Sequence, residues 1–188
     1  HRGCGRSGGT SDTWTLDQWA DDVAEFCKAL GIENPIVFGQ SFGGMVAMHF
    51  AARYPGMASQ LILSSTAAHF ELGATLAMAR QLGGDPAAGA AHTLFTEPSL
   101  ESYEEYAKIC LPLYTRTTPQ SGASFRDRAI ERPAVTVHFF REEMMDMDMR
   151  PQIAGISWLG RLWRRIYGSG PESPQWLVLR RPVRFAPV

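Results

Sequence analysis

The amino-acid sequence predicts an α/β fold in which a parallel sheet has flanking helices and a helical insertion. Three observations lead to this prediction. Helical and strand patterns alternate over the first 68 residues, the connections between them are short, and both strand segments are almost wholly apolar. Such strands are typical of parallel sheets, which helices cover on both faces. With 188 residues, 45% of them hydrophobic, the chain can bury one core of ordinary size.

The first predicted helix begins after Thr15. Thr15 and Gln18 form a capping-box pattern, and Gly31 marks the end of the helix because glycine readily adopts the left-handed conformation found there. Between these signals, apolar residues recur at helical spacing, which predicts one buried face. The residues of that face are Leu16, Trp19, Ala20, Val23, Phe26, Cys27 and Leu30.

Two strands and a second helix follow. The segment PIVFG, residues 35–39, predicts a short strand buried on both faces, and QLILSST, residues 60–66, predicts another. The helical pattern between them begins at Phe42 and ends before Pro55. Because right-handed crossovers join consecutive strands in this kind of sheet, we expect the two strands to lie parallel.

The pattern changes after residue 68. The signals become mostly helical, at residues 69–84, 99–114 and 134–149. We therefore expect three parts: an α/β core at 1–68, a helical cap at 69–150, and a return segment with an atypical tail at 151–188.

The tail from Ser157 onward has an unusual composition. It contains six arginines, three tryptophans and one acidic residue, Glu172, so its formal charge is +5 (6 − 1) and the preceding residues carry −6 (−1 − 5). We interpret this arginine-rich, acid-poor segment as the product of a GC-rich gene translated out of frame. The alternative is an interaction tail that binds an acidic partner or lipid headgroups.

The segment GQSFGG, residues 39–44, places Ser41 between glycines where the first strand gives way to the second helix. A Gly-x-Ser-x-Gly pattern arises by chance in roughly one such chain in ten, but the strand-turn-helix context is typical of a nucleophilic serine. Gly39, Gly43 and Gly44 are expected to permit a strained turn and a close approach of the helix to the strands. The alternative is a serine that only caps the helix.

Four segments together resemble the α/β-hydrolase superfamily, and more narrowly its proline iminopeptidase-like branch: HRGCGRSGG, TLDQWADDVAEFCKALGI, GQSFGGMVAMHFAARYP and LILSSTA. The resemblance implies that Ser41 is the catalytic nucleophile and that the backbone N–H of Phe42 is one oxyanion donor. Gln40 would occupy the variable position before the nucleophile. It also implies hydrolysis through an acyl-enzyme, with no metal or organic cofactor.

The chain departs from that family where the rest of the catalytic triad is expected. In the superfamily the acid and then the histidine follow the serine, yet no histidine follows His138. The loop that supplies the second oxyanion donor in relatives is expected upstream of the first residue. We expect structural or surface positions for the remaining candidates, which are His49, His69, His92, His138, Asp146 and Asp148.

The resemblance implies hydrolysis of N-terminal prolyl peptides or amides. Relatives hold the substrate's ammonium group with cap carboxylates, but Thr136 stands where one such glutamate is common, and Glu104, Glu142 or Glu143 would have to replace it. Ester or enol-lactone hydrolysis is therefore one alternative. An inactive fragment or a non-catalytic interaction protein is another, because the triad histidine is missing.

Composition limits the expected partners. A formal net charge of −1 gives no reason to expect nucleic acid, and no apolar run reaches the roughly 18 residues that span a bilayer. Cys4, Cys27 and Cys110 show no metal-binding or redox spacing. We expect a cytoplasmic protein with a small-molecule or short-peptide substrate and without metal, membrane or nucleic-acid partners.

Overall fold

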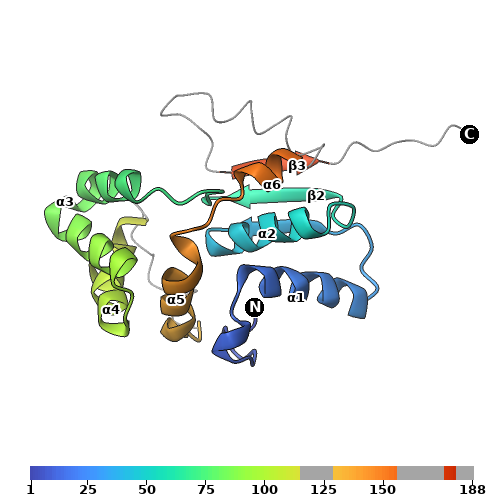
Figure 1. Cartoon of the computed structure of the whole chain (residues 1–188), viewed down its shortest axis with the longest axis horizontal. Coiled ribbons are helices and arrows are strands. Elements are labelled where there is room, and N and C mark those ends of the chain that lie inside the picture. Colours follow the sequence, from blue (N-terminus) through green and yellow to red (C-terminus); the bar gives the residue numbers. More distant parts are fainter. Residues whose placement is uncertain (115–128, 156–175, 181–188) are drawn as a thin grey trace, which may run out of the picture. The chain divides into compact units, whose positions relative to one another are not determined.

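The computed structural model describes residues 1–114, 129–155 and 176–180, and the chain divides into two compact units (Figure 1). The helical unit comprises His1–Thr15 and Phe70–Met147. The sheet unit comprises Leu16–His69 and the chain from Asp148 onward. The predicted three-part division at residues 68 and 150 stays a prediction.

The sheet unit contains three strands in the order β1-β2-β3. β1 (Ile36–Gln40) and β2 (Gln60–Ser64) pair in parallel, with Ile36 opposite Gln60 and Gln40 opposite Ser64. This confirms the predicted α/β class and the predicted parallel pair. β3 (Trp176–Arg180) pairs antiparallel with β2 and is not among the predicted strands. Its sequence, WLVLR, is nevertheless an apolar run that contains the β-branched Val178.

Helices α1 (Leu16–Ala29) and α2 (Phe42–Arg53) pack side by side (Figure 1). Small residues make close approach possible, since the buried cluster between them consists of Ala20, Ala24, Phe50 and Ala58. The predicted end of α1 is confirmed. Gly31 adopts φ 64° and the Ile32 N–H donates to the Cys27 carbonyl at 2.8 Å, which closes the helix.

Two predictions about burial in this unit are wrong. Phe26 and Leu30 were expected on the buried face of α1 but are 61% and 60% exposed. Ile36 and Phe38 of β1, expected to be covered, are 59% and 62% exposed. For Ile36 and Phe38 the physical reason is alternation along the strand, because Val37 packs toward the α1–α2 cluster and its two neighbours project from the opposite face.

The helical unit is built from α3 (Leu72–Thr96), α4 (Leu100–Ile109) and α5 (Pro133–Phe139), which continues into a π-helical turn over Phe140–Met144. The predicted helices are therefore present. The second half of α3 was not predicted, because Gly83, Gly84 and Pro86 together resemble a helix end. The structure shows a kink there instead: Gly84 leaves the helical conformation at φ 72°, and Pro86 starts the next segment, where a proline is tolerated.

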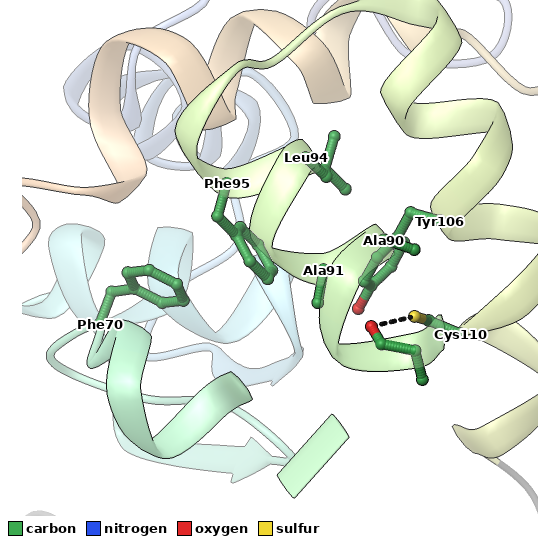
Figure 2. Packing of buried hydrophobic residues seen from close by; sticks show 8 residues of the cluster. Phe70, Ala90, Ala91, Leu94, Phe95, Tyr106 and Cys110 are labelled. Carbon is green, nitrogen blue, oxygen red and sulfur yellow. Dashed lines mark hydrogen bonds between the residues drawn. The ribbon is translucent and has the colours of Figure 1, made fainter. Parts of the chain in front are cut away.

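Aromatic side chains fill the core of the helical unit (Figure 2). The Phe95 ring lies 5.0 Å from Phe70, 5.9 Å from Tyr106 and 5.2 Å from Phe140, centroid to centroid. Alanines of α3 let α4 approach closely, so that Cys110 Sγ donates a hydrogen bond to the carbonyl of Ala87 at 3.4 Å. Burial raises the pKa of both the Cys110 thiol and the Tyr106 hydroxyl.

The tail hypotheses concern residues that lie mostly outside the described part of the chain. Only 176–180 of the tail are described, so the frame-shift interpretation and the interaction-tail alternative stay predictions. Among the described helices, none combines the length and the apolar character needed to cross a bilayer.

Candidate active site

Ser41 occupies the turn between β1 and α2. Its backbone adopts φ 50° and ψ −123°. Such a conformation is uncommon for a residue with a side chain, and residues held in sparsely populated regions cost of order 1–3 kcal/mol unless their surroundings fix them. The sheet unit therefore maintains a strained serine at the end of a strand.

Backbone contacts from the neighbouring strand hold this turn. The Ser41 N–H donates to the Ser64 carbonyl at 3.0 Å, directly beside the last paired residues of β1 and β2. The Thr66 hydroxyl donates to the Ser41 carbonyl at 2.8 Å. The same carbonyl accepts from the N–H groups of Gly44, at 2.9 Å, and Met45, at 3.3 Å, as α2 begins. Both sides of the strained residue are thus fixed.

Two of the three glycines have the predicted steric role. A Cβ on Gly39 would lie 2.3 Å from the Gly43 carbonyl oxygen, and one on Gly44 would lie 2.5 Å from the Thr66 side chain. Gly43 differs, since a Cβ there would meet nothing within 4 Å among the described residues. The expectation that Gly43 avoids a side-chain clash is therefore wrong, because it contributes its backbone to the contact with Gly39.

The alternative that Ser41 is an ordinary helix cap disagrees with the geometry. Its side chain makes no capping hydrogen bond to α2, and its φ is positive, whereas capping residues normally adopt extended backbone angles. Ser41 is exposed. Among the described residues, none hydrogen-bonds its hydroxyl.

Gln40 and Phe42 flank the serine. Gln40 is the last residue of β1 and is exposed, and Phe42 is the first residue of α2. The Phe42 ring packs edge-on against Trp19 of α1, with centroids 4.8 Å apart and planes at 89°. This contact anchors the first turn of α2, where backbone N–H groups and the helix dipole favour negative charge.

No histidine of the described residues hydrogen-bonds the Ser41 hydroxyl. His49 lies eight residues further along α2, about 12 Å at the rise of an α-helix, and its Nδ1 lies 3.1 Å from Asp17 Oδ1. His138 packs edge-on against Trp14 at 5.6 Å, and His92 is exposed on α3. These placements are structural or peripheral.

His69 follows β2 and forms an antiparallel bridge with Asp148. Asp148 accepts two hydrogen bonds from the Arg150 side chain, at 2.8 and 2.6 Å, and one from its backbone N–H at 3.0 Å. These bonds, aided weakly by the charge of His69, lower the pKa of Asp148 to about 2. Asp148 therefore binds Arg150, the first residue of α6 (Arg150–Gly155).

Charged side chains of α1 and α2 form an ion cluster of Asp17, Asp21, His49, Arg53 and Tyr54. Arg53 donates to both carboxylate oxygens of Asp21, at 2.8 Å each, and to Asp17 at 2.9 Å. The Arg53 hydrogen bonds hold the pKa of Asp21 below its usual value, and the Asp21 hydrogen bond raises the pKa of Tyr54. Sequence patterns gave no signal for this cluster, because its hydrogen-bonded pairs are up to 36 residues apart.

Residues 1–114, 129–155 and 176–180 contain no group of three or more histidine, cysteine or acidic side chains arranged to hold a metal ion. Cys27 and Cys110 are buried and Cys4 is partly buried, and all three are free thiols. The chemistry that the described residues offer at the carboxyl end of β1 is therefore that of a serine hydroxyl beside a helix N-terminus.

A strained serine between a parallel strand and a helix defines an α/β protein with a strand-turn-helix site. Comparison with known families identifies it further, because residues 1–156 match the α/β hydrolase fold family. The chain belongs to that family. The matched residues end directly before the tail that begins at Ser157.

Curated relatives match over shorter segments. A proline iminopeptidase of Clostridium botulinum is 39% identical over 67 residues, which cover 34% of this chain and 23% of the relative. A putative carbamate hydrolase of Rhizobium rhizogenes is 38% identical over 64 residues, covering 34% and 24%. A bifunctional esterase/perhydrolase of Acinetobacter calcoaceticus is 41% identical over 54 residues, covering 29% and 20%. The alignments thus span less than a quarter of each relative's length.

Among solved structures, a hydrolase from Pseudomonas aeruginosa PA01 is similar to this chain. It is 22% identical, with a TM-score of 0.44, and the match covers 81% of this chain and 54% of that one.

Proposed function

We propose that this chain is part of a serine hydrolase in which the Ser41 hydroxyl attacks the substrate carbonyl and forms an acyl-enzyme. The observation that carries the proposal is the conformation of Ser41. Its φ is positive, and two hydrogen bonds fix it: the Ser41 N–H donates to the Ser64 carbonyl and the Thr66 hydroxyl donates to the Ser41 carbonyl. The Ser41 hydroxyl itself caps no helix. Maintaining strain at an exposed serine is accounted for by a catalytic role and not by a capping role.

In this proposal the residues around Ser41 have separate roles. The N–H of Phe42, at the first position of α2, stabilises the oxyanion of the tetrahedral intermediate, and the helix dipole acts in the same direction. Gly39 and Gly44 let α2 pass close to β1 and Thr66. Gln40 and Gly43 complete the turn. The acid, the base and the second oxyanion donor are assigned to no described residue.

For the substrate, we propose an N-terminal prolyl peptide or amide, in agreement with the proline iminopeptidases among the relatives. Ester or enol-lactone hydrolysis is the alternative, which the esterase relative supports, as does Thr136 of α5 in place of a glutamate. Both reactions use the same acyl-enzyme chemistry. We further propose that the enzyme is cytoplasmic, needs no cofactor or metal, and acts on small molecules or short peptides.

The nucleophile is tested by covalent labelling. In a longer form of the protein that restores a C-terminal histidine, a fluorophosphonate probe should label Ser41, and mass spectrometry of the digest should locate the adduct. Ser41→Ala should abolish labelling, while Ser65→Ala, a matched change directly after β2, should leave it. Labelling that survives Ser41→Ala would contradict the proposal.

The substrate class is tested by comparing turnover of a prolyl arylamide with that of a short acyl ester in the same longer form. A preference for the arylamide supports the peptidase function. A strong preference for the ester would replace it with the alternative.

A non-catalytic function is the second candidate for residues 1–188 alone. Its supporting observation is that no histidine of the described residues reaches Ser41, and a serine without an assisting base is a weak nucleophile. The 188-residue chain should therefore hydrolyse an activated ester no faster than its Ser41→Ala variant. Ser41-dependent turnover would show that one of the four internal histidines acts as the base.

A further inference from the structure

The carbonyl of Ser41 and the N–H of Phe42 belong to one peptide group, at the point where α2 begins. A peptide group is planar, and in the trans form its carbonyl and N–H bonds point in opposite directions. Any contact that fixes the carbonyl oxygen therefore also fixes the direction of the N–H. In the proposed function this N–H is the oxyanion donor, so the contacts of the Ser41 carbonyl decide how that donor is aimed.

Among the described residues, three groups donate to the Ser41 carbonyl. The N–H groups of Gly44 and Met45 belong to the first turn of α2 and lie at 2.9 and 3.3 Å, as in the first turn of an ordinary helix. The third donor is the Thr66 hydroxyl, at 2.8 Å, which comes from the segment after β2. Thr66 therefore acts on this peptide group from outside the helix.

The register of the sheet brings Thr66 to this position. Gln40, the last residue of β1, pairs with Ser64, the last residue of β2, and the Ser41 N–H donates to the Ser64 carbonyl at 3.0 Å. The segment after β2 thus starts directly beside the Ser41 turn. Thr66 follows two residues later and is partly buried.

The first turn of α2 leaves room for the Thr66 side chain. A Cβ on Gly44 would lie 2.5 Å from the Cγ2 methyl of Thr66 and 2.6 Å from its Oγ1, so both branches of the threonine lie close to the glycine. Threonine is β-branched and therefore stiff about χ1. This packing keeps the hydroxyl directed at the Ser41 carbonyl.

The Thr66 hydrogen bond also strengthens the oxyanion donor. A hydrogen bond to the carbonyl oxygen draws electron density from the amide nitrogen, which makes the N–H of the same peptide group a better donor. Hydrogen bonds arranged in a chain reinforce one another in this way. The negative charge on the substrate oxygen would be stabilised along the line from the Phe42 N–H through the Ser41 carbonyl to the Thr66 hydroxyl.

We propose that Thr66 is a positioning residue which, through the Ser41–Phe42 peptide group, aims and polarises the oxyanion donor, an inference that rests on the proposed serine hydrolase function. Thr66 acts on the tetrahedral state and not on the bound substrate, because the full negative charge exists only after Ser41 has attacked. It should therefore change the stabilisation of the oxyanion and leave ground-state binding unchanged.

A butyl trifluoromethyl ketone and the alcohol of the same carbon skeleton separate these two states. In the longer form of the protein that restores a histidine, the Ser41 oxygen bonds to the ketone carbon. The carbonyl electron pair moves to the ketone oxygen, and the serine proton passes to the histidine base. The adduct carries the oxyanion that the Phe42 N–H stabilises. The alcohol forms no covalent bond and reports on binding alone.

Thr66→Val removes the hydroxyl and keeps the branched shape of the side chain. We expect it to weaken inhibition by the ketone about tenfold, less than the roughly 10²–10³-fold loss in kcat when an oxyanion donor is removed outright. The affinity for the alcohol should not change. The value of kcat/KM for a short acyl ester should fall by the same factor as the ketone affinity. Thr66→Ser keeps a hydroxyl and should retain all three values.

Thr96→Val is the matched control. The Thr96 hydroxyl also donates to a backbone carbonyl at 2.8 Å, that of His92, but it is exposed at the end of α3. Its loss should alter neither affinity nor kcat/KM, and circular dichroism should show the same helix content for both valine variants. If Thr66→Val does not fold, Thr66→Cys replaces it, because its S–H is a weak donor and its ketone affinity should fall below that of Thr66→Ser.

Three results would overturn the inference: an unchanged ketone affinity in the folded Thr66 variant, an equal loss of affinity for ketone and alcohol, or the same loss in Thr96→Val. Ser41→Ala distinguishes this failure from failure of the proposed function. If fluorophosphonate labelling and ketone inhibition survive Ser41→Ala, both the function and the inference are wrong. If both depend on Ser41 while Thr66→Val has no effect, only the inference is wrong.

Discussion

The sheet unit and the helical unit use alanine in the same way but fix their key contacts differently. In both, alanines let two helices approach: Ala20 and Ala24 between α1 and α2, and Ala87 with its neighbours between α3 and α4. Around the Ser41 turn, however, backbone meets backbone, as at Gly39. In the helical unit, aromatic side chains around Phe95 fill the space. A single added methyl group should therefore destabilise the Ser41 turn, whereas loss of side-chain volume should destabilise the helical unit.

The largest effect is expected from Gly39→Ala. Its Cβ would lie 2.3 Å from a backbone oxygen, so the strand and helix must move apart, and we expect a loss of ~4 kcal/mol or more in the free energy of unfolding. Urea denaturation of the chain, followed by circular dichroism, measures this loss.

Gly43→Ala is the matched control for that change. A Cβ there meets nothing within 4 Å, and alanine is the better helix former by about 1 kcal/mol. It should leave stability unchanged or raise it. If Gly39→Ala and Gly43→Ala lower stability equally, the close contact between Gly39 and the Gly43 carbonyl is not what makes the turn intolerant of a side chain.

Phe95→Ala should have the next largest effect. Removing a ring that contacts three other aromatic rings leaves a cavity, and we expect a loss of about 3 kcal/mol in the free energy of unfolding of the helical unit. Differential scanning calorimetry checks the value. Phe26→Ala removes the same ring at a 61% exposed position and should cost little. A comparable loss from Phe26→Ala would contradict the packing described for α1.

Arg53→Ala should cost about 1 kcal/mol. The three hydrogen bonds of Arg53 to Asp21 and Asp17 join α1 to α2, but their side chains are partly exposed and solvent screens them. Arg80→Ala removes a more exposed pair with Asp85 on α3 and should be neutral within the error of urea denaturation. If both variants cost the same, the ion cluster contributes no more than an ordinary surface pair.

The smallest effect concerns acid. Because Arg53 lowers the pKa of Asp21 in the folded chain, ionised Asp21 contributes stability above the unfolded pKa of about 4, and that contribution is lost as the pH falls below it. Stability measured between pH 6 and pH 3 should therefore fall less steeply in Asp21→Asn than in the unchanged chain. In an Arg53→Ala background, Asp21→Asn should alter the slope less, because only Tyr54 and Lys28 then lower the pKa of Asp21. An unaltered difference there would assign the effect to another group.

Sequence patterns predicted the parts of this molecule that depend on local geometry. Gly31, Pro55 and the glycines around Ser41 set helix ends and a turn through their own backbone conformations, so neighbouring residues are sufficient to recognise them. Ser41 itself was placed by its position between a strand and a helix, and the structure adds its strained φ.

The rest depends on long-range contacts that periodicity does not encode. Apolar character marked Ile36 and Phe38 as covered, but coverage requires a second layer on that face of the sheet, which the strand's own sequence cannot specify. The residues at the kink near Gly84 are those of a helix end, so the second half of α3 was not predicted. β3 lies in the tail, where the arginine-rich composition was interpreted and the apolar run was not. Sequence patterns also gave no signal for a cavity of about 520 Å³ in the helical unit, because its walls come from distant segments, near residues 6, 104 and 132.

The exposed pair on β1 has a consequence for the lifetime of the polypeptide in a cell. Phe38 and Ile36 offer solvent a surface of the kind that chaperones and proteases recognise in incompletely folded proteins. We expect chaperones and proteases to set the steady-state amount of the 188-residue chain, independently of any chemistry at Ser41. Exchanging Phe38 for lysine should raise its abundance and lengthen its half-life in a pulse-chase experiment, although no catalytic group has changed.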